Sequence, residues 1–424
     1  MNIIDELSWR GAVNQMTDEE GLRKLTEEKS ISLYCGVDPT GDSMHIGHLI
    51  PFMMLKRFAN AGHHPFVVIG GGTGTIGDPS GRKTERQLQT LDTIKNNAEK
   101  LKAQFTHLFG DSENITFVNN YDWLSQIGLL EFLRDYGKLF SVNIMLSKEV
   151  VASRLEAGIS FTEFSYQILQ SIDFEHLFSK NDVQLQIGGA DQWGNITAGI
   201  DTIRKMHGSE AKAFGLTIPL MLKSDGTKFG KTAGGAVWLD PEKTSPFEFY
   251  QFWLNQDDAD VVKYLKYFTF LSKEEIDALA EAVETEPEKR LAQRRLAEEV
   301  TTFVHSPEAL KEAQNITEAL YHGSIADLSE HELEQAFGKM PTVDVTNEDK
   351  DVVNWLIDAN IYKSKRQARE DITNGAVTIN GVKVTSVDEI VKPHKNSNGK
   401  FVIVRKGKKK YTLARVQQIG RAHV

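Results

Sequence analysis

The sequence predicts an α/β fold, in which a doubly wound parallel sheet is followed by an all-helical domain and a small, basic α+β domain. From residue 31 to about 222, β-rich runs alternate with helical patterns, as in parallel sheets with crossover helices. Residues 245–340 are helical in pattern and rich in Ala and Glu, without clear strands. The length of 424 residues exceeds what one compact core usually accommodates, so we expect two or three domains.

The first region contains five strand candidates and five helix candidates. The strand candidates are residues 31–36, 65–70, 115–119, 183–187 and 216–222. The helix candidates lie near 46–61, 90–109, 128–137, 162–178 and 192–206. Glycine-rich segments follow the strands, and ligands of doubly wound sheets bind at the carboxyl ends of strands. We therefore expect the binding site at that edge of the sheet.

The carboxyl-terminal part changes in character after a polar stretch at 341–351, which we interpret as a linker. Beyond it, a short helix at 365–374 is accompanied by strand-like runs at 376–379 and 401–404. The chain shows no internal repeat and no low-complexity region.

Composition excludes several classes of protein. Hydrophobic residues make up 40% and charged residues 25% of the chain, as in soluble globular proteins. No apolar run approaches the roughly 18 residues needed to cross a bilayer. The first residues are acidic, unlike a signal peptide, and one cysteine cannot form an internal disulfide. We expect a cytoplasmic protein that does not enter a membrane.

The net charge of −10 is unevenly distributed. Residues 361–424 hold 15 Lys and Arg against 4 Asp and Glu, whereas the rest of the chain holds 34 against 55. A basic module on an acidic body is typical of a protein that meets a polyanion at one end. A solvated basic face would explain the same charges, and both interpretations stay open at this point.

Two glycine motifs resemble nucleotide-binding loops but fail in detail. Gly72, Gly74 and Gly77 fit G-x-G-x-x-G, yet residues 78–81 continue as a turn where a dinucleotide site needs a helix. Residues 226–232 resemble a P-loop but have three residues between the glycines instead of four. Neither motif predicts its usual ligand.

His45 and His48 follow a tight turn and lead into a helical pattern. Zinc is poorly supported, because no matching second pair of ligands accompanies them. Buried, hydrogen-bonded histidines are the plain alternative. A third interpretation fits better: cationic or donor imidazoles at a helix amino end can bind phosphate, and Gly47 would let a flat ring pack against the backbone.

Taken together, these motifs closely resemble the bacterial tyrosyl-tRNA synthetases of the first synthetase class, over nearly the whole chain. Residues 45–48 match the first class signature, and residues 228–232 match a divergent second signature that keeps both lysines. Segments 34–40, 77–81, 166–170 and 188–195 lie in the expected order around them. The resemblance implies a Rossmann-like catalytic domain at 1–222 with a dimer-forming helical insertion near 124–160. It further implies a lysine loop and anticodon-side helical domain at 223–340, a linker at 341–351, and an RNA-binding domain at 352–424.

The resemblance also implies a tyrosine pocket. Tyr34 and Asp173 would bind the phenol, and Asp78, Tyr166 and Gln170 the ammonium group. Independently, Tyr166, Gln170 and Asp173 stand at i, i+4 and i+7 and so share one helix face. A solvated stripe would give the same spacing, but aromatic and aliphatic residues interleave with these three, which favours a pocket.

ATP would lie across the strand ends according to the same resemblance. The residues implied in ATP binding are Gly36, Asp38, Thr40, Gly47, His48, Gly189, Asp191, Gln192 and Lys231. The residues implied in catalysis are Thr40, His45, His48, Arg82, Arg86, Lys228 and Lys231. No protein-ligated metal is expected, because Mg²⁺ would be held mainly by the ATP phosphates. Two positions depart from the family pattern. Some relatives carry Lys at position 82, so either Arg82 or Lys83 would contact the pyrophosphate. Pro51 falls just inside a helix, where it would set the helix start or a kink.

The basic tail resembles a small RNA-binding module of a ribosomal protein. Residues implied in binding RNA phosphates are Lys365, Arg366, Arg369, Lys408, Lys409 and Lys410. The function implied is ATP-dependent formation of tyrosyl-adenylate and transfer of tyrosine to the 3′-terminal adenosine of tRNA(Tyr), by a homodimer. A tryptophanyl-tRNA synthetase and a catalytically silent RNA-binding regulator are the alternatives. The Tyr34 and Asp173 pair favours a phenol over an indole.

Overall fold

The computed structural model describes residues 1–110, 114–232, 234–323, 325–395, 399–408 and 410–417. Two compact units divide the chain: residues 1–243 with 256–296, and residues 244–255 with 297–424. Each unit is described by itself. No helix in the described part of the chain is long and apolar enough to span a bilayer.

The first unit is built on a six-stranded sheet of order β1-β6-β5-β2-β3-β4. Its strands are β1 (Gln15–Met16), β2 (Ser32–Val37), β3 (His64–Ile69), β4 (Thr116–Asn119), β5 (Val183–Gly189) and β6 (Phe214–Ile218). β2 to β6 pair in parallel, and β1 is an antiparallel edge strand. The predicted doubly wound sheet is confirmed.

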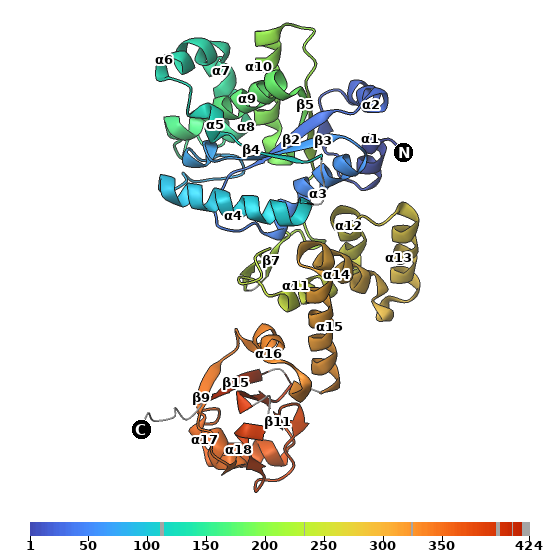
Figure 1. Ribbon diagram of the computed structural model, residues 1–424, viewed down its shortest axis with the longest axis vertical. Coiled ribbons are helices and arrows are strands. Elements are labelled where there is room, and N and C mark those ends of the chain that lie inside the picture. Colours follow the sequence, from blue (N-terminus) through green and yellow to red (C-terminus); the bar gives the residue numbers. More distant parts are fainter. Residues whose placement is uncertain (111–113, 233, 324, 396–398, 409, 418–424) are drawn as a thin grey trace. The chain divides into compact units, whose positions relative to one another are not determined.

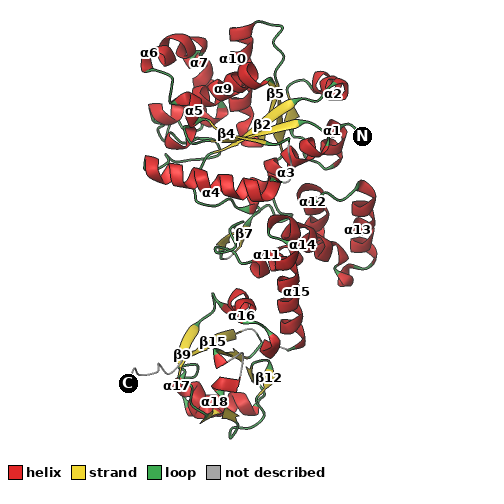
Figure 2. Cartoon of the chain, in the orientation of Figure 1, coloured by secondary structure: helices red, strands yellow, loops and turns green. Residues whose placement is uncertain are grey.

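Helices cover both faces of this sheet (Figure 1, Figure 2). α3 (Ile46–Asn60) and α4 (Leu91–Phe109) lie on one face, and α9 (Phe161–Asn181) and α10 (Trp193–His207) lie on the other. The remaining helices of the unit are α1 (Ile3–Trp9), α2 (Glu19–Glu28), α5 (Tyr121–Leu124), α6 (Leu129–Glu131), α7 (Val142–Ser147), α8 (Glu149–Ala152), α12 (Asp258–Phe268) and α13 (Lys273–Thr285). A two-stranded ribbon, β7 (Lys231–Thr232) and β8 (Gly235–Ala236), completes the unit.

The topological switch point of the sheet lies between the neighbouring strands β2 and β5. From β2 the chain crosses to β3 and β4 on one side, and then returns to β5 and β6 on the other. Doubly wound sheets bind ligands outside the carboxyl ends of strands at this switch. The carboxyl ends of β2, β3 and β5 therefore frame the candidate site.

Two elements of this unit differ from the prediction. The strand expected at 216–222 ends at Ile218, because Pro219 has no N–H to donate to a ladder. The helix expected near 128–137 is broken into α6, a wide helical turn at Phe132–Tyr136 and a 3₁₀ turn at Gly137–Leu139.

The second unit joins helices to a small sheet. Its helices are α11 (Pro246–Leu254), α15 (Pro307–His322), α16 (Glu330–Phe337), α17 (Val352–Asp358) and α18 (Lys365–Thr373), and α14 (Leu291–Val304) enters it. Its strands are β9 (Thr342–Val345), β10 (Lys350–Asp351), β11 (Val377–Ile379), β12 (Val382–Lys383), β13 (Ile390–Val391), β14 (Phe401–Lys406) and β15 (Lys410–Val416). The helical region and the small α+β domain are confirmed.

The prediction of a linker at 341–351 is wrong. β9 lies in the five-stranded sheet β12-β11-β14-β15-β9, where it pairs in parallel with β15. Val345 is buried in the core of the domain together with Val352 and Trp355. The polar residues that suggested a linker occupy the outward positions of an edge strand and the turn after it, where polarity is expected.

Candidate active site

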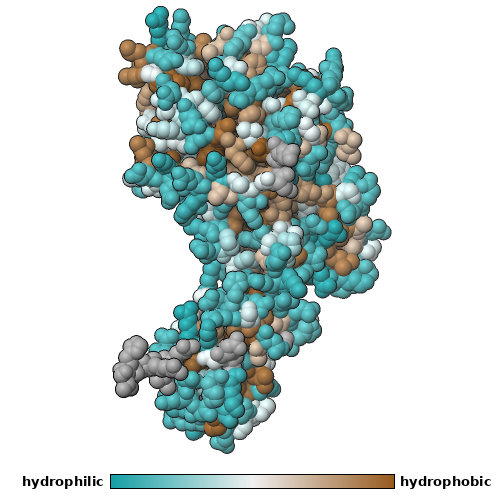
Figure 3. Space-filling view, in the orientation of Figure 1, coloured by the Kyte–Doolittle hydropathy of each residue, from teal (hydrophilic) through white to brown (hydrophobic). Residues whose placement is uncertain are grey.

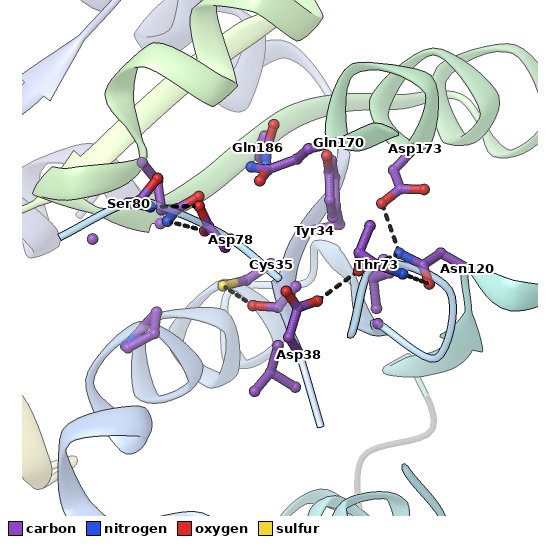
Figure 4. Close-up of a pocket in the computed structure, with 18 of the residues that line it drawn as sticks. Tyr34, Cys35, Asp38, Thr73, Asp78, Ser80, Asn120, Gln170, Asp173 and Gln186 are labelled. Carbon is purple, nitrogen blue, oxygen red and sulfur yellow. Dashed lines mark hydrogen bonds between the residues drawn. The ribbon is translucent and has the colours of Figure 1, made fainter. Parts of the chain in front are cut away.

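A cavity of about 270 Å³ opens at the carboxyl ends of β2, β3 and β5 (Figure 4). Of the predicted tyrosine and ATP residues, the following line it: Tyr34, Gly36, Asp38, Thr40, His48, Asp78, Arg86, Tyr166, Gln170, Asp173, Gly189, Asp191 and Gln192. Arg82 lies in a neighbouring cavity together with Thr40 and Arg86. The fold therefore gathers residues from five separate segments of the chain into one place.

One end of the cavity offers a hydroxyl and a carboxylate. The hydroxyl of Tyr34 is buried and has no hydrogen-bond partner among the described residues. Asp173 faces the same space from α9 (Figure 4) and accepts hydrogen bonds from Nδ2 of Asn120 at 2.9 Å and Nε1 of Trp123 at 2.8 Å. Burial raises the pKa of Asp173 to about 7, although both of these hydrogen bonds oppose the rise.

Asn120 and Trp123 are functional candidates that the sequence analysis missed. Both follow β4 directly, so they lie at the same edge of the sheet as the cavity. Asn120 also donates to Oγ1 of Thr73 at 2.9 Å and accepts from the backbone N–H of Gly72 at 2.8 Å. Their place just after a predicted strand is the signal that could have found them.

Carboxylates gather farther along the cavity. The hydroxyl of Tyr166 donates to Oδ2 of Asp38 at 2.7 Å, and Oγ1 of Thr73 donates to Oδ1 at 2.6 Å. Burial raises the pKa of Asp38 to about 6. Asp78 accepts from Nε2 of Gln192 at 2.9 Å. Two carboxylates in a largely enclosed space attract a cation such as an ammonium group.

A glycine makes this arrangement possible. A Cβ on Gly70, at the end of β3, would lie 2.0 Å from Oδ1 of Asp38. No larger residue fits there unless the Asp38 carboxylate moves away from Thr73. Gly70 was not among the predicted site residues.

His45 and His48 form the amino end of α3. The backbone N–H of Gly47 donates to Nδ1 of His45 at 3.1 Å, and the N–H of His45 donates to Nδ1 of His48 at 3.2 Å. The two rings stack at 3.8 Å, and a Cβ on Gly47 would lie 2.9 Å from the His45 ring. Gly47 thus permits close packing of a ring, which here is the ring of His45.

Burial of these histidines favours the donor interpretation over the cationic one. Burial lowers the pKa of His48 to about 3, and burial with the nearby charge of Lys231 lowers the pKa of His45. Because Nδ1 accepts a hydrogen bond in each neutral ring, Nε2 carries the proton. Both imidazoles therefore offer an N–H donor without a positive charge.

Positive charge is supplied by arginines and lysines. The side chain of Arg86 lines the cavity, and its Nε donates to the carbonyl oxygen of Asp78 at 2.8 Å. Partial burial and the neighbouring charge of Arg86 lower the pKa of Arg82. Lys228 and Lys231 flank the buried Phe229 and are exposed, outside the residues that line the cavity.

Ser80, Gln186 and Asn195 also line or support the cavity. Nδ2 of Asn195 donates to Oε1 of Gln170 at 3.1 Å and to Oγ of Ser80 at 3.3 Å. Gln186 points into the cavity from β5 (Figure 4). In the described part of the chain no cluster of three or more His, Cys, Asp and Glu side chains could hold a metal ion.

The second unit carries the predicted RNA-binding residues on its surface. Lys365, Arg366 and Arg369 are exposed on α18, whereas Ala368 and Ile372 of the same helix are buried. Lys408 and Lys410 are exposed near the turn between β14 and β15. Lys409 lies outside the described residues, as do residues 418–424.

Comparison with known proteins defines the class first. A family model described as tRNA synthetases class I (W and Y) matches residues 26–322, and one described as the tyrosine–tRNA ligase SYY-like C-terminal domain matches residues 332–414. A truncated mitochondrial tyrosyl-tRNA synthetase from Aspergillus nidulans is similar in structure, with a TM-score of 0.68 and 32% identity over 75% of this chain and 94% of that one. The fold is that of a class I aminoacyl-tRNA synthetase.

Within this class, the similar curated proteins are tyrosine–tRNA ligases. Tyrosine–tRNA ligase 1 of Enterococcus faecalis is 70% identical over 98% of this chain and 100% of its own length. Tyrosine–tRNA ligase of Latilactobacillus sakei is 70% identical over 98% of this chain and 99% of its own length. The chain belongs to the tyrosine–tRNA ligase family.

Proposed function

We propose that the protein activates L-tyrosine with MgATP to form tyrosyl-adenylate and pyrophosphate, and then transfers tyrosine to the 3′-terminal adenosine of tRNA(Tyr). The observation that carries the choice of tyrosine is the pair formed by Tyr34 and Asp173. The buried Tyr34 hydroxyl, which has no partner in the part of the chain that the structure describes, faces the same space as a carboxylate held by Asn120 and Trp123. Together they offer one donor and one acceptor, which is what a phenolic hydroxyl satisfies.

The ammonium group of tyrosine would be bound by Asp78, Tyr166 and Gln170. The tyrosine carboxylate then attacks the α-phosphate in line and expels pyrophosphate. The carboxylate is already a nucleophile, so the protein contributes position and charge stabilisation rather than proton transfer. Asp38, Asp191 and Gln192, with the backbone at Gly36, Gly47 and Gly189, would hold the nucleoside.

The phosphates would meet two kinds of donor. His45, at the amino end of α3, and Thr40, in the turn after β2, offer neutral donors to the γ-phosphate, and backbone N–H groups at that helix end also favour anions. His48 would donate to the ribose. Arg82, Arg86, Lys228 and Lys231 offer positive charge that stabilises the leaving pyrophosphate. Lys228 and Lys231 would reach it by movement of their loop. The phosphates themselves would carry Mg²⁺, which prefers oxygen ligands and water.

The experiment that tests this function is tyrosine-dependent exchange of pyrophosphate into ATP without tRNA, repeated with phenylalanine and tryptophan. We expect exchange with tyrosine alone, and its loss in Asp173→Ala and Lys231→Ala. Exchange with tryptophan would keep the mechanism and overturn the substrate. No exchange by folded protein would leave a silent, RNA-binding protein.

We also propose a homodimer in the cytoplasm. Large apolar side chains are exposed in and after the helical insertion near 124–160, namely Leu129, Leu130, Leu133, Val142, Ile144, Leu155 and Phe161. Apolar residues gather over α6 and α7 in Figure 3 as well. A contiguous apolar surface of this kind is typical of a subunit interface. Sedimentation equilibrium tests it: Leu130→Asp with Leu133→Asp should shift a dimer towards monomer.

A further inference from the structure

A buried ion pair lies beside the loop that carries Arg82 and Arg86, and the function proposed above makes no use of it. Arg154 follows α8, and Glu163 lies in the first turn of α9. Each side chain is 1% exposed, and Nη1 of Arg154 lies 2.9 Å from Oε2 of Glu163. Apolar residues of similar volume would usually be as stable in such a place, so stability alone does not account for the pair.

The pair binds two consecutive residues of the loop. Oε1 of Glu163 accepts the backbone N–H of Arg86 at 2.7 Å, and Nη2 of Arg154 lies 3.2 Å from Oε2 of Glu85. Glu85 in turn accepts hydrogen bonds from the hydroxyl and the backbone N–H of Ser160, the residue that caps α9. Both oxygens of Glu163 are therefore occupied, one by the partner charge and one by the loop.

Arg86 is held from a second side as well. Its Nε donates to the carbonyl oxygen of Asp78 at 2.8 Å, and its side chain lines the cavity. The backbone of Arg86 is thus fixed to α9, and its guanidinium is fixed to the segment before the loop. α9 also carries Tyr166, one turn beyond Glu163, so a single helix sets the positions of both the loop and the tyrosine pocket.

We propose that Arg154 and Glu163 are positioning residues that hold the loop at 85–86 so that Arg86 faces the pyrophosphate side of the active site. The inference rests on the proposed role of Arg86 towards pyrophosphate. A cation stabilises a leaving group best when it is already in place, because no reorganisation is then needed during the reaction. A network of charged hydrogen bonds fixes the loop in one orientation, because each bond requires a defined geometry. Apolar packing imposes no such requirement.

The test replaces the pair by apolar residues of similar size, Arg154→Met with Glu163→Met, in the full-length protein. Unfolding should stay close to the wild type, because no buried charge is left unpaired. The rate of tyrosine activation should fall about 10- to 100-fold, as expected for a displaced catalytic cation. The KM for pyrophosphate in the reverse reaction should rise by a similar factor, while the KM for tyrosine stays within about twofold.

The matched control is Arg57→Met, which removes another buried arginine of the same unit. Among the described residues, the side-chain hydrogen bonds of Arg57 go to the carbonyl oxygens of Lys266, Tyr267 and Thr269, none of which belongs to the loop. The folded variant should keep the wild-type activation rate and KM for pyrophosphate, even if its free energy of unfolding is lower. Equal kinetic losses in the control and the double variant would overturn the proposal.

A surface variant keeps the test valid if the double variant does not fold. Glu85→Ala removes a half-exposed partner of Arg154 and should lower the activation rate by about 3- to 10-fold with unchanged KM for tyrosine. Wild-type rates in Glu85→Ala would refute a positioning role, and so would wild-type rates in a folded double variant. Arg86→Ala separates the proposed role of Arg86 from the positioning role of Arg154 and Glu163. If Arg86→Ala activates tyrosine at the wild-type rate, the proposed role of Arg86 fails. If Arg86→Ala loses activity but the variants of Glu85, Arg154 and Glu163 do not, only the positioning role fails.

Discussion

Tyr34 and Asp173 meet at the end of the cavity from different elements, β2 and α9. Each brings a polar group into a buried place, and the Tyr34 hydroxyl lacks a partner within the described chain. A buried polar group without a partner is unfavourable, so a substrate hydroxyl at this point is bound strongly, and an analogue lacking it leaves the group unpaired. Selectivity against phenylalanine then needs no second, editing site.

Tyr34→Phe should reduce this selectivity. Without the Tyr34 hydroxyl, the substrate phenol keeps only its contact with Asp173, so kcat/KM for tyrosine should fall about tenfold, as for the loss of one neutral hydrogen bond. The value for phenylalanine should change less. Pyrophosphate exchange with each amino acid measures the ratio, and an unchanged ratio would place the phenol elsewhere.

The ionisation of Asp173 predicts a pH dependence. Because burial raises its pKa to about 7, the carboxylate that accepts the phenol is lost as the pH falls through 7, and kcat/KM for tyrosine should decline on that acid side. Trp123→Phe removes a donor that favours the carboxylate, so the decline should move to higher pH. Trp9→Phe, at the end of α1 and outside the residues that line the cavity, is the control, and an identical profile for the two variants would contradict the assignment.

The same group affects stability with a definite sign. The pKa of Asp173 is higher in the folded than in the unfolded protein, so its contribution to stability is present below its ordinary pKa and is lost as the pH rises through about 7. Ionisation of Asp173, which the proposed binding of the phenol requires, therefore lowers the stability of the free enzyme.

At the scale of elements, α4 holds the turn that precedes the two histidines. Nδ2 of Asn97 donates to the carbonyl oxygen of Pro39 at 3.1 Å. Gln104 donates to Oγ of Ser43 at 2.8 Å and accepts the N–H of Met44 at 2.9 Å. Asn97 and Gln104 are seven residues apart and lie on the same face of the helix. One helix face thus fixes a turn that has no regular structure of its own.

α3 contains a proline in its sixth position. The sequence suggested that Pro51 sets the start or a kink of the helix, yet the helix begins at Ile46 and Pro51 lies inside it, lining the cavity. Having no N–H, Pro51 cannot donate to the carbonyl oxygen of Gly47, four residues earlier. The helix therefore lacks one hydrogen bond at the edge of the site.

Pro51→Ala should stabilise the protein, because it restores the donor and removes the clash of the ring with the preceding turn. An increase of about 1–3 kcal/mol in the free energy of unfolding is expected from the usual effect of proline within a helix. Urea denaturation measures it, with Ala59→Pro near the end of the same helix as the opposite control. A lower stability of Pro51→Ala would show that the proline ring is needed for packing.

At the scale of the whole molecule, the charge of the chain is divided. The net charge is −10, but 15 of the 49 basic residues lie in residues 361–424 with only 4 acidic ones. The active-site cavity belongs to the first unit, and the basic surface of α18 belongs to the second. The proposed chemistry on small substrates and the proposed binding of a polyanion thus belong to different units.

Neutralising the exposed cations of α18 should separate the two steps of the reaction. The triple change Lys365→Ala, Arg366→Ala and Arg369→Ala should raise the KM for tRNA about 10-fold or more at moderate salt, because each lost phosphate contact lowers affinity. Exchange of pyrophosphate without tRNA should be unaffected. The dependence of tRNA affinity on salt should become shallower, and an unchanged slope would mean that these residues do not contact phosphate.

Local patterns determined most of the fold. Strand–helix alternation predicted the parallel sheet, since hydrophobic periodicity depends on near neighbours along the chain. The face formed by Tyr166, Gln170 and Asp173 was also predictable, because a helix fixes the positions of residues four and seven apart. The edge strand β9 was missed, because a short polar edge strand resembles a linker until its partner, β15, is known.

The sequence by itself determined the order of elements, the class signatures and the residue types of the pocket. Only the tertiary structure decided what those residues do to one another. Asn120 and Trp123 bind Asp173 from 53 and 50 residues away in the sequence, and Glu163 binds the backbone of Arg86 from 77 residues away. Burial, which makes the two histidines neutral and raises the pKa of Asp173, is a property of packing by all neighbours at once. No local pattern encodes it.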